Sequence, residues 1–140
     1  MRDTHIQYID SAANLLPNQL PGFFVGWPNP PSLEMHLALL RQSDYVLLAL
    51  DPESDTIVGF ITAISDHVLC AYIPLLEVLP SYQGQGIGRE LLTRMLEKIG
   101  QFYMVDVMCD AELQPFYAHL GMKKATGMML RNYSALKGEE

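Results

Sequence analysis

Apolar residues recur every three or four positions between residues 87 and 99, which is the strongest periodic pattern in the chain. Charged residues occupy the positions between them, so a helix here would bury one face and expose the other. Gly100 follows directly, and a glycine is common at the end of a helix. The pattern predicts an amphipathic helix over residues 87–99, with apolar positions Ile87, Leu91, Leu92, Met95, Leu96 and Ile99.

Three weaker patterns predict further helices. Ser32 is a favourable N-cap before residues 33–41, where leucines fall on one helical face. Residues 114–120 form a short helical pattern that Gly121 ends, and residues 11–20 form a broken one that ends at a Pro-Gly pair. We therefore expect about four helices in total.

Apolar runs separated by turn residues predict strands. Residues 45–50 and 57–64 are joined by the turn sequence DPESD and should pair as a hairpin, whereas the long run at residues 68–79 ends at Pro80. Strands that alternate with helices in the second half of the chain indicate one α/β (α+β) domain with a mixed sheet over residues 1–140. The predicted strands are residues 4–9, 45–50, 57–64, 68–79, 103–109 and 126–133.

The charge of the chain limits its partners. Nine Lys and Arg stand against 16 Asp and Glu, for a net charge of −7, and no run of basic residues suits a nucleic acid. A cationic small molecule fits better, although an acidic surface also serves simply to keep a cytosolic protein soluble. No signal-peptide core and no apolar stretch of about 18 residues is present, so we expect a cytoplasmic protein without a membrane partner.

Two cysteines, Cys70 and Cys109, are the only ones in the chain. They lack the CxxC spacing of zinc and redox sites, so no metal site is expected. Each lies in an apolar run, which favours buried free thiols.

Residues 21–31, PGFFVGWPNPP, concentrate proline, glycine and aromatic residues and must form a loop with an apolar lining. Phe23, Phe24 and Trp27 could wall a substrate pocket. They could equally plug one end of the core, and the sequence does not decide between the two.

The sequence QGQGIG at residues 83–88 stands between a predicted strand and the amphipathic helix. Glycines let the backbone approach a phosphate, successive N–H groups converge on the anion, and the helix N-terminus adds partial positive charge. A Rossmann motif would need a glycine where Arg89 stands, and a P-loop would need a Lys followed by Ser or Thr. The segment therefore predicts a cofactor that carries a diphosphate, held by a different motif.

The motif that fits is Q-x-x-G-x-G, formed by Gln83, Gly86 and Gly88 and preceded by LEVLP at residues 76–80. Downstream, QPFYAHLGM at residues 114–122 is similar to an F-Y-x-x-L-G-F segment. In this order the two motifs resemble the GNAT superfamily of CoA-dependent N-acyltransferases, over residues 57 to 122. The resemblance implies a mixed, mostly antiparallel sheet of six to seven strands, about four helices, and a splay between the fourth and fifth strands.

The same resemblance assigns acetyl-CoA as the cofactor. Leu76 and Val78 would lie beside its pantetheine arm. Asp110 stands where many family members carry an asparagine, so a contact from this position to the cofactor is in doubt. The pyrophosphate would be held by the backbone of Gln83, Gly84, Gln85, Gly86, Ile87 and Gly88, with Arg89 opening the helix.

Two residues are candidates for proton chemistry. Tyr117 would be the general acid, because a phenol can give a proton or a hydrogen bond to the departing thiolate; packing of its ring in the core is the alternative. Glu77 is the one carboxylate in an apolar run and is a candidate base for an ammonium substrate, unless it is only a solvent-facing strand residue. His67 and His119 are more typical of surface or structural histidines.

The leading hypothesis is an N-acetyltransferase that moves an acetyl group from acetyl-CoA to a primary amine of a small molecule or peptide, by direct attack in a ternary complex and without a cysteine nucleophile. Alternatives are a non-catalytic CoA-binding regulatory module and an acyltransferase acting on a protein amino group or using a longer acyl chain. The resemblance also allows a homodimer, for which residues 126–133, with Met128 and Met129, could offer an edge strand. The alternative is an ordinary capped edge in a monomer.

Overall fold

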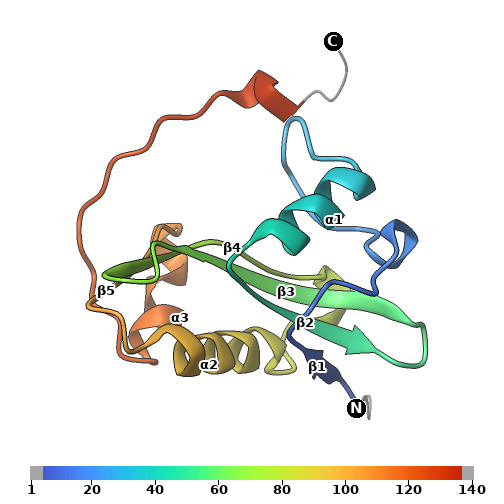
Figure 1. Cartoon of the computed structure of the whole chain (residues 1–140), viewed down its shortest axis with the longest axis horizontal. Coiled ribbons are helices and arrows are strands. Elements are labelled where there is room, and N and C mark those ends of the chain that lie inside the picture. Colours follow the sequence, from blue (N-terminus) through green and yellow to red (C-terminus); the bar gives the residue numbers. More distant parts are fainter. Residues whose placement is uncertain (1–4, 137–140) are drawn as a thin grey trace.

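A computed structural model describes residues 5–136 and contains one five-stranded sheet in the order β1-β2-β3-β4-β5. Figure 1 shows the sheet as a twisted layer between helices. The first four strands pair as antiparallel neighbours, whereas β5 runs parallel to β4. The strands are β1 (Gln7–Ile9), β2 (Tyr45–Asp51), β3 (Thr56–Ser65), β4 (Cys70–Val78) and β5 (Met104–Val107).

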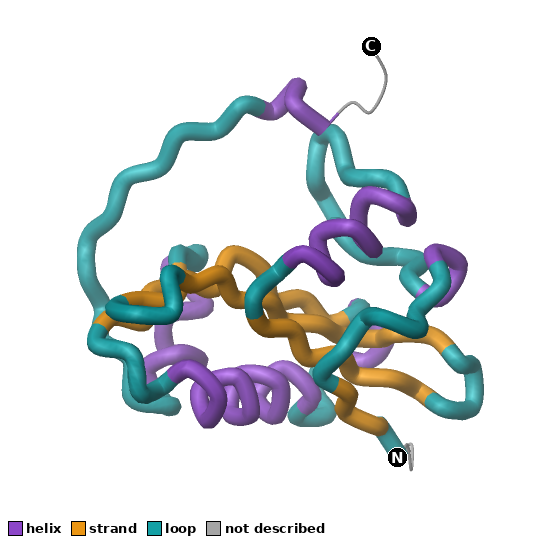
Figure 2. The backbone as a smooth tube through the Cα atoms, viewed as in Figure 1, coloured by secondary structure: helices purple, strands orange, loops and turns teal. Residues whose placement is uncertain are grey.

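Helices cover both faces of the sheet. The helix α2 (Ile87–Ile99) makes the crossover between the parallel strands β4 and β5, and with the short α3 (Gln114–Ala118) it lies on one face. The helix α1 (Leu33–Gln42) lies on the other face (Figure 2). The predicted mixed α/β architecture is therefore confirmed, with five strands and three α-helices within residues 5–136 instead of six to seven strands and about four helices.

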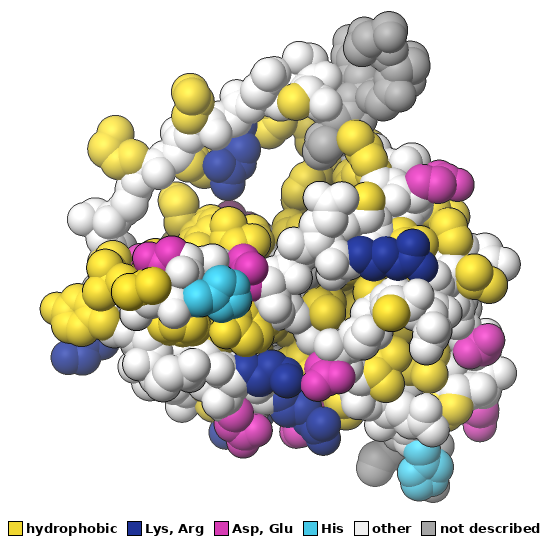
Figure 3. Space-filling model, viewed as in Figure 1, with side chains coloured by type: hydrophobic (Ala, Val, Ile, Leu, Met, Phe, Trp, Pro, Cys, Tyr) yellow, Lys and Arg dark blue, Asp and Glu magenta, His cyan; other side chains and the backbone are white. Residues whose placement is uncertain are grey.

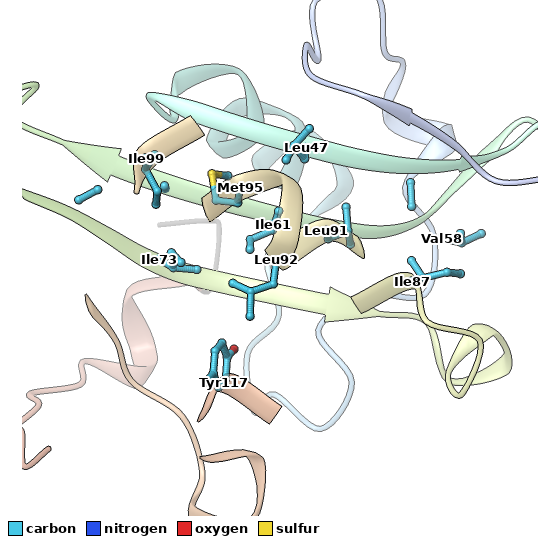
Figure 4. Packing of buried hydrophobic residues seen from close by; sticks show 13 residues of the cluster. Leu47, Val58, Ile61, Ile73, Ile87, Leu91, Leu92, Met95, Ile99 and Tyr117 are labelled. Carbon is cyan, nitrogen blue, oxygen red and sulfur yellow. The ribbon is translucent and has the colours of Figure 1, made fainter. Parts of the chain in front are cut away.

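The apolar face of α2 is the centre of the larger core. Leu91, Leu92, Met95 and Ile99 have no exposed surface and pack on strand residues that include Ile61 (Figure 4). Close approach of helix and sheet depends on β3 having a glycine beneath α2. A Cβ atom at Gly59 would stand only 3.2 Å from side-chain atoms of Ile87 and Leu91. Each fully buried leucine contributes roughly 1.5–3 kcal/mol, so this face supplies much of the stability.

The second core lies under α1. Ser32 is the N-cap, as predicted, and its hydroxyl accepts a hydrogen bond of 3.1 Å from the Met35 amide. Leu37 and Leu40 are buried against Phe60 and Leu48 of the sheet. His36 is buried beside them, at 1% exposure, and its ring meets three phenylalanine rings, those of Phe23, Phe24 and Phe60.

Two predicted elements are wrong. Residues 11–20 contain one short 3-10 helix, Pro17–Gln19, because Pro17 opens a new turn instead of continuing an earlier one. Residues 126–133 form no strand, since no neighbouring strand lies beside them to complete a ladder. The remaining predictions differ at element ends only, and Thr4, the first residue of the predicted strand 4–9, lies outside the described residues.

Candidate active site

The sheet opens between β4 and β5. Their parallel pairing begins at Cys70 with Met104 and ends at Ile73 with Val107. Pro74 follows, beside an irregularity in the pairing of β3 with β4, and has no N–H for a ladder. Residues 74–78 therefore keep β3 as their one strand neighbour, which leaves the β5 side of their backbone open where the splay is expected.

The glycine loop lies at the open end of β4. Gly84 and Gly86 have φ angles of +80° and +86°, a left-handed conformation that favours glycine, and Gly86 is the N-cap of α2. The side-chain amide of Gln83 donates a hydrogen bond of 2.9 Å to the Val78 carbonyl and so ties the loop to β4. A Cβ atom at Gly84 or Gly86 would meet nothing within 4 Å, so the space beside both glycines is open.

This loop presents unpaired hydrogen-bond donors. Within residues 5–136, we find no acceptor for the backbone N–H groups of residues 84–89, and the N-cap Gly86 offers no side chain to satisfy them. The Arg89 side chain is exposed and has no ion-pair partner in the same part of the chain. Converging amides, the helix dipole and a free guanidinium form a site for an anion such as a diphosphate.

Gly88 has a different role from the other two glycines. It lies inside α2, and a Cβ atom there would stand 3.6 Å from the Val78 side chain and 3.8 Å from the ring of Phe116. A methyl group there would thus make ordinary van der Waals contacts with β4 and α3. Leu76 and Val78 pack their side chains into the core beneath α2, so they offer the open site their backbone.

Tyr117 belongs to the same core as α2, and Figure 4 shows its ring beside Leu92 with the hydroxyl oxygen at its far end. The residue is 7% exposed, and its ring stands edge-on to Phe116 with centroids 5.0 Å apart. Burial, with a smaller contribution from Cys109, raises the pKa of Tyr117 to about 12. We find no hydrogen-bond partner for the hydroxyl within the described residues, so it is available to a ligand.

Glu77 lies on the opposite face of the sheet, the face that α1 covers, because side chains alternate along β4. Its two carboxylate oxygens accept hydrogen bonds of 2.9 and 3.0 Å from the Phe24 amide, and one accepts a bond of 3.3 Å from the Val25 amide. Phe24 has a φ angle of 64°, uncommon for a residue other than glycine. The carboxylate therefore stabilises the turn of the aromatic loop.

The three aromatic residues of that loop differ in their exposure. Phe24 is 4% exposed and packs on His36 and Phe60, so it plugs the core. Phe23 is half-buried with its ring edge-on to Phe60 at 5.1 Å. Trp27 keeps 42% of its surface exposed, with its ring 4.9 Å from that of Phe24. Of the three, Trp27 is the one that can present a broad apolar surface to an acceptor.

The remaining candidates have contacts of their own or are exposed. Asp110 is exposed beyond the end of β5, and its carbonyl accepts a hydrogen bond from the Leu113 amide. His67 contacts Asp44 at 2.9 Å in the β3–β4 turn, and His119 is exposed at the end of α3. His67 thus has a structural contact, and the structure assigns no role to His119.

The two cysteines, Cys70 and Cys109, are free, as predicted, but only partly buried. Burial and the charge of Asp110 raise the pKa of the Cys109 thiol. Within the described part of the chain, no group of three or more His, Cys, Asp or Glu residues could hold a metal ion, and no helix is long and apolar enough to cross a membrane.

A cavity of about 610 Å³ lies elsewhere, between the segment after β1, the end of α1 and the start of β2. Its charged groups are already engaged. Arg41 donates hydrogen bonds to the carbonyls of Ala12, Ala13 and Leu15, and Lys98 contacts Asp10 at 3.1 Å. This hollow offers no free charge comparable with that of the glycine loop.

Two chemical functions thus meet at the opening of the sheet. Donors for an anion and the Tyr117 hydroxyl lie on the α2 face, and the Glu77 carboxylate and the aromatic loop lie on the α1 face. The sheet thus carries a phenol hydroxyl on one face and a carboxylate on the other.

Comparisons with known proteins agree on one family. The model of the family described as "Acetyltransferase (GNAT) family" matches residues 12–122. Histone acetyltransferase TAP1 of Glycine max is 29% identical over 111 residues, which cover 71% of this chain and 47% of that protein. The chain therefore spans about half the length of that curated relative.

Solved structures extend the likeness over nearly the whole chain. A protein of Deinococcus radiodurans R1, described as a candidate acetyltransferase, is 42% identical with a TM-score of 0.90, over 96% of this chain and 94% of that one. A GNAT-family acetyltransferase of Streptococcus pneumoniae TIGR4 is 31% identical with a TM-score of 0.74, over 91% of this chain and 98% of that one.

Proposed function

The chain belongs to the GNAT family of acetyltransferases, and from this premise we propose that it transfers an acetyl group from acetyl-CoA to a primary amine. The observation that carries the proposal is the set of unpaired N–H groups at residues 84–89, beside the open edge of β4. A helix N-terminus with open space at Gly84 and Gly86 suits the pyrophosphate of CoA, and Arg89 supplies a matching positive charge.

Acetyl-CoA would supply a thioester as the activated acyl donor. The residues that would hold it are those of the glycine loop for the pyrophosphate and the backbone of Leu76 and Val78 for the extended pantetheine arm. Gln83 would contribute indirectly, because its side chain fixes the loop on the Val78 carbonyl. Whether Asp110 also contacts the cofactor stays a prediction.

We propose that the Tyr117 hydroxyl donates a hydrogen bond to the sulfur that departs. With a pKa of about 12, the phenol stays protonated through the working pH range. Transfer of its proton to a thiolate with a pKa of about 8.5 would be uphill by roughly 5 kcal/mol. The hydroxyl is therefore better suited to stabilise the thiolate than to give up its proton completely.

The Glu77 carboxylate is proposed to accept the proton of the incoming ammonium, directly or through one water. Two backbone N–H groups occupy part of its capacity, and a carboxylate has about four lone-pair sites, so acceptor sites remain. The same hydrogen bonds orient its oxygens, which is what a positioned base requires.

The acceptor is a small-molecule or peptide amine in this proposal. The net charge of −7 favours a cationic acceptor, and the exposed ring of Trp27 offers it an apolar or cation–π surface. The name of the Glycine max relative, a histone acetyltransferase, keeps a protein amino group as the second candidate.

The direct test is release of free thiol from acetyl-CoA in the presence of a panel of amines, including a polyamine, an aminoglycoside and a lysine peptide. We expect at least one amine to raise thiol release well above hydrolysis and to gain an acetyl group by mass spectrometry. Binding of acetyl-CoA without turnover on any amine would instead support a non-catalytic CoA-binding module.

A further inference from the structure

Tyr82 stands directly before the glycine loop and ties it to a distant part of the sheet. Its hydroxyl donates a hydrogen bond of 2.6 Å to the Oδ2 atom of Asp51, which lies 31 residues earlier in the chain. Asp51 is the last residue of β2, and Tyr82 is the last residue of the short 3-10 helix Pro80–Tyr82 that follows β4. A bond of this length between a hydroxyl and a carboxylate is typical of the strong, charge-assisted class.

The carboxylate of Asp51 differs from those of its acidic neighbours. The turn between β2 and β3 contains three acidic residues, Asp51, Glu53 and Asp55. Glu53 and Asp55 are exposed, and Figure 3 shows acidic side chains at the surface of this end of the sheet. Asp51 is only 5% exposed, and its Oδ1 atom accepts a hydrogen bond of 3.0 Å from the Glu53 amide. One buried carboxylate therefore holds both the turn and Tyr82.

The bond between Tyr82 and Asp51 holds the first end of the glycine loop. Two other hydrogen bonds, each of 2.9 Å, hold the same segment: the Leu79 amide donates to a carbonyl of β3, and the Gln83 side chain donates to a carbonyl of β4. Of these three contacts, the Tyr82 bond is the one that reaches β2. At the other end of the loop, Ile87 begins α2 and is 3% exposed in the core. Residues 83–86 are therefore held between Tyr82 and Ile87.

The hold on its ends decides where the loop directs its amides. Within residues 5–136, the backbone N–H groups of residues 84–89 have no acceptor, so their own hydrogen bonds do not fix their direction. Two of the residues between the held ends are glycines, which have the widest backbone freedom. Donors bind an anion best when they are already aligned, because aligning them on binding costs entropy. The bond of Tyr82 thus supports the alignment that a diphosphate needs.

Asp51 and Tyr82 are not suited to contact the diphosphate themselves. A carboxylate repels an anion, and the single proton of the Tyr82 hydroxyl is directed to Asp51. We propose that Asp51 and Tyr82 form a positioning pair, which fixes the glycine loop so that its amides converge on the diphosphate of the cofactor. This inference rests on the proposed function, because it assumes that the loop binds acetyl-CoA.

The first test is calorimetric titration of acetyl-CoA into wild type, Tyr82→Phe and Tyr45→Phe. Both tyrosines are half-buried against the same core, and Tyr45 lies at the end of β2 opposite to Asp51, so Tyr45→Phe is a matched control. Tyr82→Phe keeps the ring and should raise the dissociation constant at least about fivefold, whereas Tyr45→Phe should stay within about twofold of wild type.

The outcomes of this titration separate two failures. Binding by wild type with an equal dissociation constant in Tyr82→Phe would overturn the positioning pair and leave the proposed function standing. Absence of binding to wild type would overturn the proposed function, and the positioning pair with it.

The second test distinguishes the loop from the rest of the site. S-acetylpantetheine lacks the diphosphate, so its dissociation constant in Tyr82→Phe should stay within about twofold of the wild-type value. Equal weakening of acetyl-CoA and S-acetylpantetheine would mean that the substitution disturbs the whole site, and it would overturn the proposal.

The third test asks whether the two residues act as a unit. The amide oxygen of Asp51→Asn can still accept the Tyr82 hydrogen bond without the charge, so this variant should weaken acetyl-CoA binding less than Tyr82→Phe does. The double variant should bind no more weakly than Tyr82→Phe alone, because the shared contact is already lost. A double variant whose loss of affinity equals the product of the two single losses would show that the residues act independently, against the proposal.

Discussion

Among single residues, Tyr117 is the one for which a chemical role of the hydroxyl and a packing role of the ring can be separated most clearly. Its ring is buried with the core, and its hydroxyl stays protonated because burial raises its pKa to about 12. Tyr117→Phe keeps the ring and removes the hydrogen-bond donor. We expect turnover to fall by about 100-fold while the affinity for acetyl-CoA stays within about twofold. Turnover and calorimetric binding measure the two effects separately.

Tyr103→Phe is the matched control, because Tyr103 is 86% exposed and should leave both quantities unchanged. Unchanged turnover in Tyr117→Phe would assign the residue to packing alone. The high pKa has a further consequence: ionisation of Tyr117 should produce no loss of activity between pH 7 and 10.

Glu77 is expected to have two roles, and its substitution can separate them. In Glu77→Gln the side chain keeps its size but cannot take up the proton of an ammonium. We expect kcat/KM to fall by about 100-fold. Glu97→Gln, an exposed carboxylate on α2, should behave as wild type. A higher KM for the amine with unchanged kcat would instead make Glu77 an anchor of the aromatic loop.

His36 should make the fold sensitive to acid. Burial lowers its pKa from 6.5 to about 4, and its buried Nε2 atom has no hydrogen-bond partner among the described residues. Between pH 4 and pH 6.5, the His36 side chain binds a proton in the unfolded chain but not in the folded chain. The contribution of neutral His36 to the free energy of unfolding is therefore complete above pH 6.5. About 3 kcal/mol of it is lost as the pH falls towards 4.

The measurement is urea unfolding of wild type and His36→Phe at pH 7 and pH 4.5, because phenylalanine keeps a ring among the three phenylalanines. The free energy of unfolding should decrease less in the variant than in wild type. An equal decrease in both proteins would show that other groups, and not His36, cause the acid sensitivity.

These residues also mark how far sequence reasoning reaches. The glycine motif and Tyr117 could be found because each lies in a short local pattern. The bond between Glu77 and the Phe24 amide could not, since 53 residues separate the two and only the fold joins them. The burial of His36 had one weak signal, its position next to Leu37 on a predicted helical face.

At the scale of elements, periodic patterns gave reliable predictions and isolated strands did not. The helix α2 matches its predicted bounds because burial against the sheet and its own helical periodicity agree. Residues 126–133 have strand-like composition, yet a strand needs a neighbour, and among the described residues they have none.

The opening between β4 and β5 likewise follows from one local feature. Pro74 interrupts the pairing at the point where β5 ends, so the rest of β4 remains accessible on that side. The apolar run alone could not reveal this opening. Residues 68–79 contain no charged residue before Glu77 that would mark where the strand becomes accessible.

In the whole molecule, the proposed cofactor face and the proposed acceptor face lie on opposite sides of one sheet. The cofactor face rests on the glycine loop and α2, and the acceptor face rests on Glu77 and the loop that carries Trp27.

The central claim is that the glycine loop binds acetyl-CoA, and calorimetric titration of acetyl-CoA into three proteins tests it most directly. Gly86 and Gly26 have nearly equal φ angles, +86° and +82°, and equally open surroundings, so alanine should strain both turns alike. Wild type and Gly26→Ala should bind acetyl-CoA with affinities within about twofold of each other, and Gly86→Ala should bind at least about 10-fold more weakly, since its amides no longer converge. No binding to wild type, or equal affinities in the two variants, would contradict the account.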